Sequence, residues 1–297
     1  MKKILLLLSF TLCTFASDAF ISPEELSQQL GDKNLVVIDV GTKDDYLLKG
    51  HVPGAVHSVI SQWRMPVKKH YVMRPQAELV KKISELGISN DSKVVLYGHG
   101  GKKQLLKASY IALMLNVFGV ENVSILNGGF EEWTYVGEVE MDAAHNKATD
   151  FKASAKSNVV VDKDFVLKNI NKIPMVEARP PRFYFGMEKS PGVKRIGHIS
   201  GGMSYFWKNS FKKEDDIAKI KTAEELRELL IEGMQLDPSK EMMVYCTGGL
   251  EASMNWYVLT QVLSFKNVKI YDASLKEWGN TDGTPMVKYR WEAFQYN

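Results

Sequence analysis

The sequence of 297 residues contains very little cysteine, with only Cys13 and Cys246. Two cysteines cannot form the disulfide framework that stabilises small secreted domains. The sequence also lacks an excess of charge of one sign, because 38 Lys and Arg face 35 Asp and Glu, for a formal net charge of +3. A charge balance of this kind provides no strongly basic surface, so we expect no nucleic-acid partner.

Recognisable metal and nucleotide motifs are missing as well. The six histidines show neither the His-Glu-x-x-His pattern nor the Cys/His spacings of zinc sites. The glycines of 98–101 precede Lys102 but do not complete a phosphate-binding loop. We therefore expect no metal and no organic cofactor. The composition, 45% hydrophobic and 25% charged, is typical of a folded chain of about two domains.

Only one long apolar run is present, from Ile4 to Phe15. Lysines precede it, and small residues of the kind found at signal-peptidase sites follow it at 17–19. This pattern predicts a signal peptide over residues 1–19 and export, into the periplasm of a bacterial cell, with an uncleaved membrane anchor as the alternative. Because no second run follows, we expect no membrane association after processing. Cys246 would then be the single cysteine of the mature chain.

Strand-length apolar runs alternate with helical patterns, which is typical of a parallel α/β sheet. The runs that predict strands are 35–38, 94–97, 123–126, 175–177, 241–245 and 268–271. The patterns that predict helices are 23–30, 76–86, 105–118 and 252–263, with a further helix opening at 222. Ser22 and Thr222 each precede a Glu by three residues, which is the capping-box signature of a helix start.

The two halves of the chain correspond to each other at a nearly constant offset. The matching pairs are His51 and His198 at 147 positions, Tyr97 and Tyr245 at 148, and Trp133 and Trp278 at 145. A constant offset of this kind indicates a tandem duplication. We predict one module over residues 22–140 and a second over 158–285. The polar stretch 137–157, poor in strand formers, is the predicted linker.

Cys246 directly follows the predicted strand 241–245 and precedes a loop with two glycines and a helix that begins near Ala252. Ligands of open α/β sheets bind beyond the carboxyl ends of the strands. Gly248 and Gly249 allow several backbone N–H groups to point at one spot, and the helix start adds a partial positive charge. Both effects favour a thiolate, so we expect the pKa of Cys246 below the usual value of about 8.5. A buried, inert cysteine is the alternative.

Four segments together resemble the tandem-domain rhodanese family of sulfurtransferases. They are "DVGTKDDYLLKGHVPGAVH" (39–57), "GHISGG" (197–202), "VYCTGGLEAS" (244–253) and "YDASLKEWG" (271–279). The resemblance implies an α/β fold of two tandem rhodanese-like modules, each a parallel sheet flanked by helices. It also implies that the second module carries catalysis and that the first, with Gly98 at the position of the nucleophile, is catalytically silent.

The resemblance implies that Cys246 is the catalytic nucleophile and that the loop from Cys246 to Glu251 surrounds its sulfur. The donor-binding residues implied in this loop are Thr247, Gly248, Gly249, Leu250 and Glu251. An arginine after the first strand of the second module would bind an anionic donor, and the candidates are Arg179 and Arg182. A surface arginine paired with a glutamate is the alternative for either of them.

The implied reaction moves sulfane sulfur from thiosulfate or a similar donor to cyanide or a thiol through a persulfide, without a cofactor, in a monomer. The alternative is a persulfide or polysulfide carrier with little turnover. Glu251 and the uncharged Thr247 keep this alternative open, because thiosulfate enzymes of the family tend to have basic residues after the cysteine. A cysteine phosphatase would require an arginine at the sixth position after Cys246, where the chain has Ala252.

Overall fold

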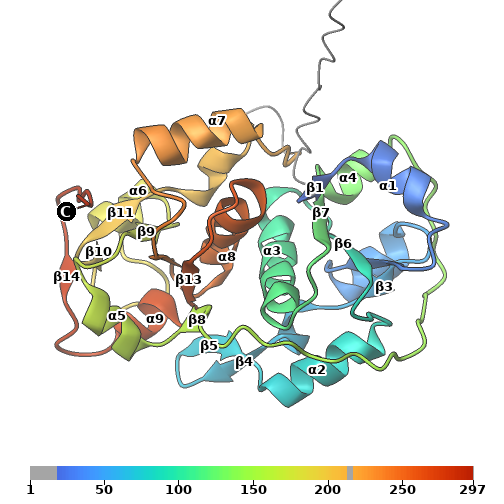
Figure 1. Ribbon diagram of the computed structural model, residues 1–297, viewed down its shortest axis with the longest axis horizontal. Helices are drawn as coiled ribbons and strands as arrows, with labels where there is room; N and C mark the ends of the chain where they lie inside the picture. Colours follow the sequence, from blue (N-terminus) through green and yellow to red (C-terminus); the bar gives the residue numbers. More distant parts are fainter. Residues whose placement is uncertain (1–18, 213–216, 297) are drawn as a thin grey trace, which may run out of the picture.

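The computed structural model describes residues 19–212 and 217–296. The two halves of the chain form two parallel five-stranded sheets, one on each side of a central pair of helices (Figure 1). The predicted α/β fold of two tandem modules is therefore confirmed.

The first sheet has the strand order β1-β7-β6-β2-β3, and all its pairs are parallel. Its strands are β1 (Phe20–Ile21), β2 (Leu35–Asp39), β3 (Val56–His57), β6 (Lys93–Tyr97) and β7 (Val123–Leu126). The central strands β2, β6 and β7 are almost wholly buried, as expected for a parallel sheet covered on both faces.

The second sheet repeats this order as β8-β13-β12-β9-β11, again with parallel pairs. Its strands are β8 (Val160–Val161), β9 (Met175–Glu177), β11 (Gly202–Ser204), β12 (Met242–Tyr245) and β13 (Val268–Tyr271). Asp39 pairs with Tyr97 at the end of the first sheet's central strands, and Glu177 pairs with Tyr245 at the same place in the second. The strand pairing thus shows which residues of the two duplicated halves correspond to each other.

Helices cover both faces of each sheet (Figure 1). The α-helices are α1 (Pro23–Gln29), α2 (Gln76–Glu85), α3 (Lys102–Val117), α4 (Gly129–Trp133), α5 (Lys163–Asn169), α6 (Pro181–Phe185), α7 (Ala223–Arg227), α8 (Leu250–Tyr257) and α9 (Ser274–Trp278). Three short π-helical segments, η1 (Asp45–Lys49), η4 (Glu228–Gly233) and η5 (Val258–Val262), and two 3-10 turns, η2 (Ile60–Gln62) and η3 (Trp207–Ser210), complete them. No helix in the described part of the chain is both long enough and apolar enough to span a bilayer.

The two modules share one continuous apolar core. Helices α3 and α8 pack against each other between the sheets, and a single buried cluster extends from the first module through both helices into the second. Within this core, the hydroxyl groups of Ser109 in α3 and Ser253 in α8 form a hydrogen bond of 2.9 Å. The site described below therefore rests on an interface that both modules build.

The strands and helix starts predicted from the sequence are largely confirmed. Both predicted capping boxes are present. The hydroxyl groups of Ser22 and Thr222 accept from the backbone N–H of Glu25 and Glu225 at the starts of α1 and α7, and the two glutamate side chains accept from the backbone N–H of Ser22 and Thr222 in return. The predicted helix 252–263 begins two residues earlier and continues as α8 and then η5. The antiparallel pairs β4 (Arg64–Val67) with β5 (His70–Met73), and β10 (His198–Ile199) with β14 (Met286–Val287), were not predicted.

The predicted linker lies along the surface of the first module. Ser154 N donates to Phe118 O at 3.0 Å, and Asn90 exchanges two hydrogen bonds with the backbone of Lys152. Backbone contacts of this kind hold an irregular segment in place without a core of its own.

Candidate active site

Cys246 lies at the carboxyl end of the central strand β12, on the side of the second sheet that faces the first module. Its backbone N–H donates to Ser274 Oγ at 3.1 Å, and Ser274 in turn donates to Tyr271 O at 2.6 Å. The side chain is only 1% exposed. The strand and this serine fix the position from which the sulfur meets the loop.

The loop after Cys246 directs backbone N–H groups at the sulfur. Gly249 N lies 3.0 Å and Gly248 N 3.4 Å from Cys246 Sγ. Gly249 has φ = +92°, and a Cβ at this position would lie 2.2 Å from Asp272 Oδ1, so only glycine fits. The nest predicted from the two glycines is therefore present, and it suits a negatively charged sulfur.

A cavity of about 790 Å³ opens above this loop. Its lining from the second module is Pro180, Arg182, Phe183, Phe206, Trp207, Lys208, Cys246, Thr247, Gly248, Leu250, Glu251 and Lys276. Its lining from the first module is Arg64, Tyr71, Lys103 and Leu106. Among the predicted donor-binding residues, only Gly249 and Arg179 are not part of the wall.

The pKa of Cys246 differs from the expectation. The pKa is raised to about 11, mainly by burial and also by the neighbouring Glu251 carboxylate, and the N–H groups of Ala252, Gly248 and Gly249 offset only part of this rise. The expected depression below the free-cysteine value is therefore wrong for the site without a donor. Sequence patterns show the loop and the helix start, but not the loss of solvent around the sulfur.

Glu251 stands in the first turn of α8, beside the thiol. Its carboxyl group is within hydrogen-bonding range of Cys246, and burial raises its pKa to about 7. Arg179 and the backbone N–H of Thr247 act in the opposite direction. Glu251 therefore changes its protonation state near neutral pH, beside the sulfur.

The two candidate arginines have different surroundings. Arg179 is 1% exposed and donates to Glu177 Oε1, to Ser190 Oγ at 2.7 Å and to Gly197 O at 2.7 Å. Arg182 lies on the cavity wall, where it pairs with Glu188 at 2.9 Å and stacks on its neighbouring ring, Phe183. Of the two, only Arg182 is placed to meet a ligand in the cavity.

A buried arginine from the first module, Arg64, reaches the same cavity. It donates to Asp272 Oδ1 at 2.8 Å, and its Nε has no hydrogen-bond partner among the described residues. Asp272 lies two residues before Ser274, which holds the backbone of Cys246. Sequence reasoning missed Arg64, because the segment around it carries no recognisable motif.

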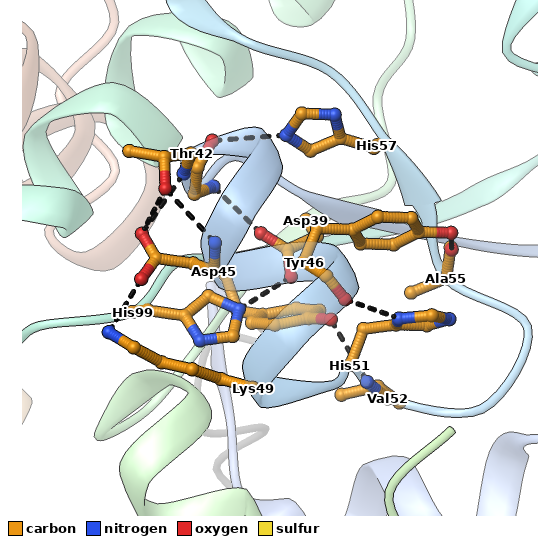
Figure 2. Close-up of polar contacts among 12 residues, drawn as sticks. Asp39, Thr42, Asp45, Tyr46, Lys49, His51, Val52, Ala55, His57 and His99 are labelled. Carbon is orange, nitrogen blue, oxygen red and sulfur yellow. Dashed lines mark hydrogen bonds and ion pairs between the residues drawn. The ribbon is translucent and has the colours of Figure 1, made fainter. Parts of the chain in front are cut away.

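In the first module, a buried histidine, His99, follows Gly98, the counterpart of Cys246. Figure 2 shows His99 directed at Asp39. His99 Nε2 and Asp39 Oδ2 form a hydrogen bond of 2.7 Å, and Gly41 N donates to the other oxygen of Asp39, Oδ1, at 2.7 Å. Gly41 corresponds to Arg179 of the second module, and a Cβ on Gly41 would lie 2.8 Å from the His99 ring. His99 therefore fills the space around the strand-end carboxylate that Arg179 fills in the second module.

The paired histidines have matching contacts. His51 stacks on Tyr46 with ring centroids 3.9 Å apart, and His198 stacks on Tyr184 at 3.8 Å (His51 and Tyr46 are drawn in Figure 2). Each ring also bonds through Nδ1 to the carbonyl of the same tyrosine. Within the described ranges, no group of three or more His, Cys, Asp and Glu is arranged to hold a metal ion.

The fold and the loop define an α/β protein of two rhodanese-type modules, one of which carries a cysteine whose sulfur accepts hydrogen bonds from backbone N–H groups of the loop that follows it. The model of the Rhodanese-like domain matches residues 22–135 and 162–281, and the chain belongs to this family. It is a sulfurtransferase, the activity for which several of its curated relatives are named.

Two curated relatives are similar over almost their whole length. A Mycobacterium bovis protein named "Putative thiosulfate sulfurtransferase 1" is 30% identical over 281 residues, which cover 91% of this chain and 97% of that protein. A Thermus thermophilus protein named "Sulfur carrier protein TtuD" is 30% identical over 290 residues, with the same coverage.

Solved structures share the fold at lower identity. The crystal structure of YnjE has a TM-score of 0.79 at 19% identity, covering 92% of this chain and 69% of that one. The wild-type structure of EanB has a TM-score of 0.77 at 22% identity, covering 94% and 70%.

Proposed function

We propose that the sulfur of Cys246 attacks the outer sulfur of thiosulfate or a similar sulfane donor and keeps it as a persulfide. With thiosulfate, a bond forms between Cys246 Sγ and the outer sulfur, the S–S bond of the donor breaks, and sulfite leaves with the electron pair and the thiol proton. The observation that carries the proposal is the pair of N–H groups, from Gly248 and Gly249, directed at Sγ on the floor of the cavity.

The second half of the reaction removes the outer sulfur. Cyanide, or a thiol in its thiolate form, attacks the terminal sulfur of the persulfide, and Cys246 is released for another cycle. The same N–H groups stabilise the negative charge that the persulfide carries between the two steps.

Intact mass spectrometry tests the first step. After incubation with thiosulfate and removal of the excess donor, we expect the chain to gain the mass of one sulfur atom and to lose it again when cyanide is added. The Cys246→Ser variant serves as the control and should gain nothing. No gain in the wild-type chain with any sulfane donor would contradict the proposal.

A carrier with slow turnover is the second candidate function. The full burial of Cys246 and its raised pKa favour it, because both slow the attack on a donor. The Thermus thermophilus relative that is named a sulfur carrier protein points the same way. Steady-state release of thiocyanate from thiosulfate and cyanide distinguishes the two: an enzyme turns over many times, whereas a carrier stops after one sulfur per chain.

We also propose that the chain is exported after removal of a signal peptide and acts as a monomer. The signal-peptide prediction falls on residues 1–19, of which 1–18 lie outside the described residues. Both walls of the cavity come from one chain, so no second copy is needed to complete it. N-terminal sequencing of the secreted protein should start near Phe20, and light scattering should give the mass of one chain. An intact Met1 or a dimer mass would contradict these proposals.

A further inference from the structure

The first module has a cavity of its own, of about 530 Å³, near the point where β3 ends at His57. Its walls come from η1, β3, α2 and the segment 143–146 of the linker. It shares no lining residue with the cavity above Cys246. Open α/β sheets bind ligands beyond the carboxyl ends of their strands, and small-molecule sites enclose about 300–1,000 Å³. Both the position and the size of this first-module cavity therefore suit a small molecule.

Two hydrogen bonds hold the linker across the first-module cavity. Ala144 N donates to Tyr46 Oη of η1 at 2.9 Å. Asn146 Nδ2 donates to Leu86 O, at the end of α2, at 2.9 Å. Because the linker is fixed on both sides, the cavity is part of the folded module and not a gap beneath a loose segment.

The duplication shows that the corresponding place in the second module is covered. Val56 corresponds to Met203, at the same offset of 147 as the paired histidines. Phe294 N donates to Met203 Sδ at 3.3 Å, and the Phe294 ring packs against the core cluster that includes Met203. The linker of the first module has the small residues Ala143 and Ala144 on the cavity wall. The space next to Val56 therefore stays open, whereas an aromatic residue covers its counterpart.

The charges on the wall of the first-module cavity are mainly positive. Lys43 and Lys82 supply ammonium groups, and Glu85 is the only acidic residue among the described residues that line the cavity. Glu85 pairs with Lys82 at 2.9 Å, and its hydrogen bond with Lys82 is the main cause of its lowered pKa. Lys43 forms no ion pair with a described carboxylate. The acid of the wall is thus already neutralised, and the charge of Lys43 is available to a ligand.

Two histidines, His57 and His145, add further polar groups to this wall. Figure 2 shows the ring of Tyr46 between those of His51 and His57, with centroid distances of 3.9 and 5.0 Å. His57 Nε2 lies 3.1 Å from Gly41 O and carries a proton, because a carbonyl oxygen only accepts. The stack and this bond fix the His57 ring, and its Nδ1 has no hydrogen-bond partner among the described residues.

The remaining wall is apolar and includes Leu47, Val56 and Leu86. We propose that the first-module cavity binds a small organic anion, whose apolar body lies against these three residues and whose charged head group meets Lys43 and the imidazoles. An organic cation would be repelled by the two lysines and would find no unpaired carboxylate on the wall. An inorganic anion would leave the apolar wall uncovered, so it would gain nothing from the hydrophobic effect.

The test reports on this cavity alone, since the cavity above Cys246 also has lysines on its wall. NMR spectra of the chain labelled with ¹³C at histidine Cε1 are recorded at pH 7, and the signals of His57 and His145 are assigned from His57→Gln and His145→Gln. The probe is 1-naphthylacetate. Titrations with 2-(1-naphthyl)ethanol and 2-(1-naphthyl)ethylammonium, which have the same carbon skeleton, run in parallel.

Three variants accompany the titrations. Lys43→Gln removes the available ammonium group from an exposed position, and Ala143→Phe fills the cavity without changing its charge. Lys208→Gln is the matched control, because it removes the same charge from the wall of the cavity above Cys246.

We expect 1-naphthylacetate to shift the signals of His57 and His145 in a saturable way. The alcohol should bind at least fivefold more weakly, and the ammonium compound should not reach saturation. The dissociation constant of 1-naphthylacetate should rise about threefold in Lys43→Gln, which is the size expected for the loss of one exposed ion pair. Ala143→Phe should abolish the shifts, and Lys208→Gln should leave the dissociation constant unchanged.

The inference is overturned if 1-naphthylacetate produces no saturable shift of either signal, or if the alcohol binds equally well. Equal weakening in Lys43→Gln and Lys208→Gln, or full binding in a folded Ala143→Phe variant, would overturn it too. Should Ala143→Phe not fold, the comparison of Lys43→Gln with Lys208→Gln decides. None of these measurements involves Cys246, so each of these outcomes leaves the proposed persulfide chemistry intact.

Discussion

Arg64 and Asp272 are 208 positions apart in the sequence, yet Arg64 Nη2 donates to Asp272 Oδ1 at 2.8 Å in a nearly solvent-free contact between the modules. The other Asp272 oxygen accepts from Met73 N at 2.7 Å and from Tyr110 Oη at 2.8 Å, both groups of the first module. The Arg64 guanidinium also stacks on Tyr110, with 4.6 Å to the ring centroid. The first module thus positions Asp272, the residue that limits the space beside Gly249.

This contact predicts a large effect of a single substitution. Arg64→Met leaves Asp272 buried without its charge partner, and breaking such a pair costs about 3–5 kcal/mol. We expect a corresponding loss in the free energy of unfolding by urea, together with slower sulfur uptake, because the loop beside Asp272 loosens. Lys93→Met, which removes a half-exposed ion pair with Asp32, is the control and should cost at most about 1 kcal/mol. Equal losses in both variants would refute the prediction.

Replacement of the nucleophile should separate activity from stability. Cys246→Ser keeps an acceptor for the N–H groups of Gly248 and Gly249, so we expect a change in melting temperature of only a few degrees. The hydroxyl group barely ionises near neutral pH, so thiocyanate production should fall to the background rate. Turnover that survives in the serine variant would show that another group carries the sulfur.

The raised pKa of Cys246 predicts a characteristic alkylation profile. Only the thiolate reacts with iodoacetamide, and with a pKa of about 11 its fraction increases about tenfold per pH unit up to pH 9 and beyond. The logarithm of the rate, measured by intact mass, should therefore rise linearly through pH 9. Free glutathione, measured in parallel, should level off above its ordinary pKa of about 8.5. A plateau for Cys246 below pH 8 would contradict the burial effect.

His99 of the first module should affect the stability of the fold but not the rate of sulfur transfer. His99→Ala leaves the buried Asp39 carboxylate with one hydrogen bond fewer, at a cost of about 1.5–3 kcal/mol in the free energy of unfolding. His99 does not line the cavity, so we expect turnover to stay within twofold of the wild type. A tenfold loss of turnover in a folded His99→Ala variant would assign the first module a direct catalytic part.

Features that depend on residues close together in the sequence were predictable from it. The central strands follow from buried apolar runs such as 94–97 and 123–126, and the start of α1 follows from the Ser22 capping box. The loop after Cys246 could be recognised because glycines, a preceding strand and a following helix lie within a few residues of one another. The short edge strands such as β3 and the hairpin β4–β5 could not, because two to four residues carry too little periodicity.

The sequence alone determined the α/β class and the duplication, and it predicted the glycine loop after Cys246, because each of these depends on local patterns and their repetition. The tertiary structure decided what surrounds that residue. Arg64 reaches the site only because the modules share one core, and neither its position nor its partner Asp272 follows from spacing along the chain. The pKa values of Cys246 and Glu251 depend on how far packing removes water from them, and burial is a property of the folded chain.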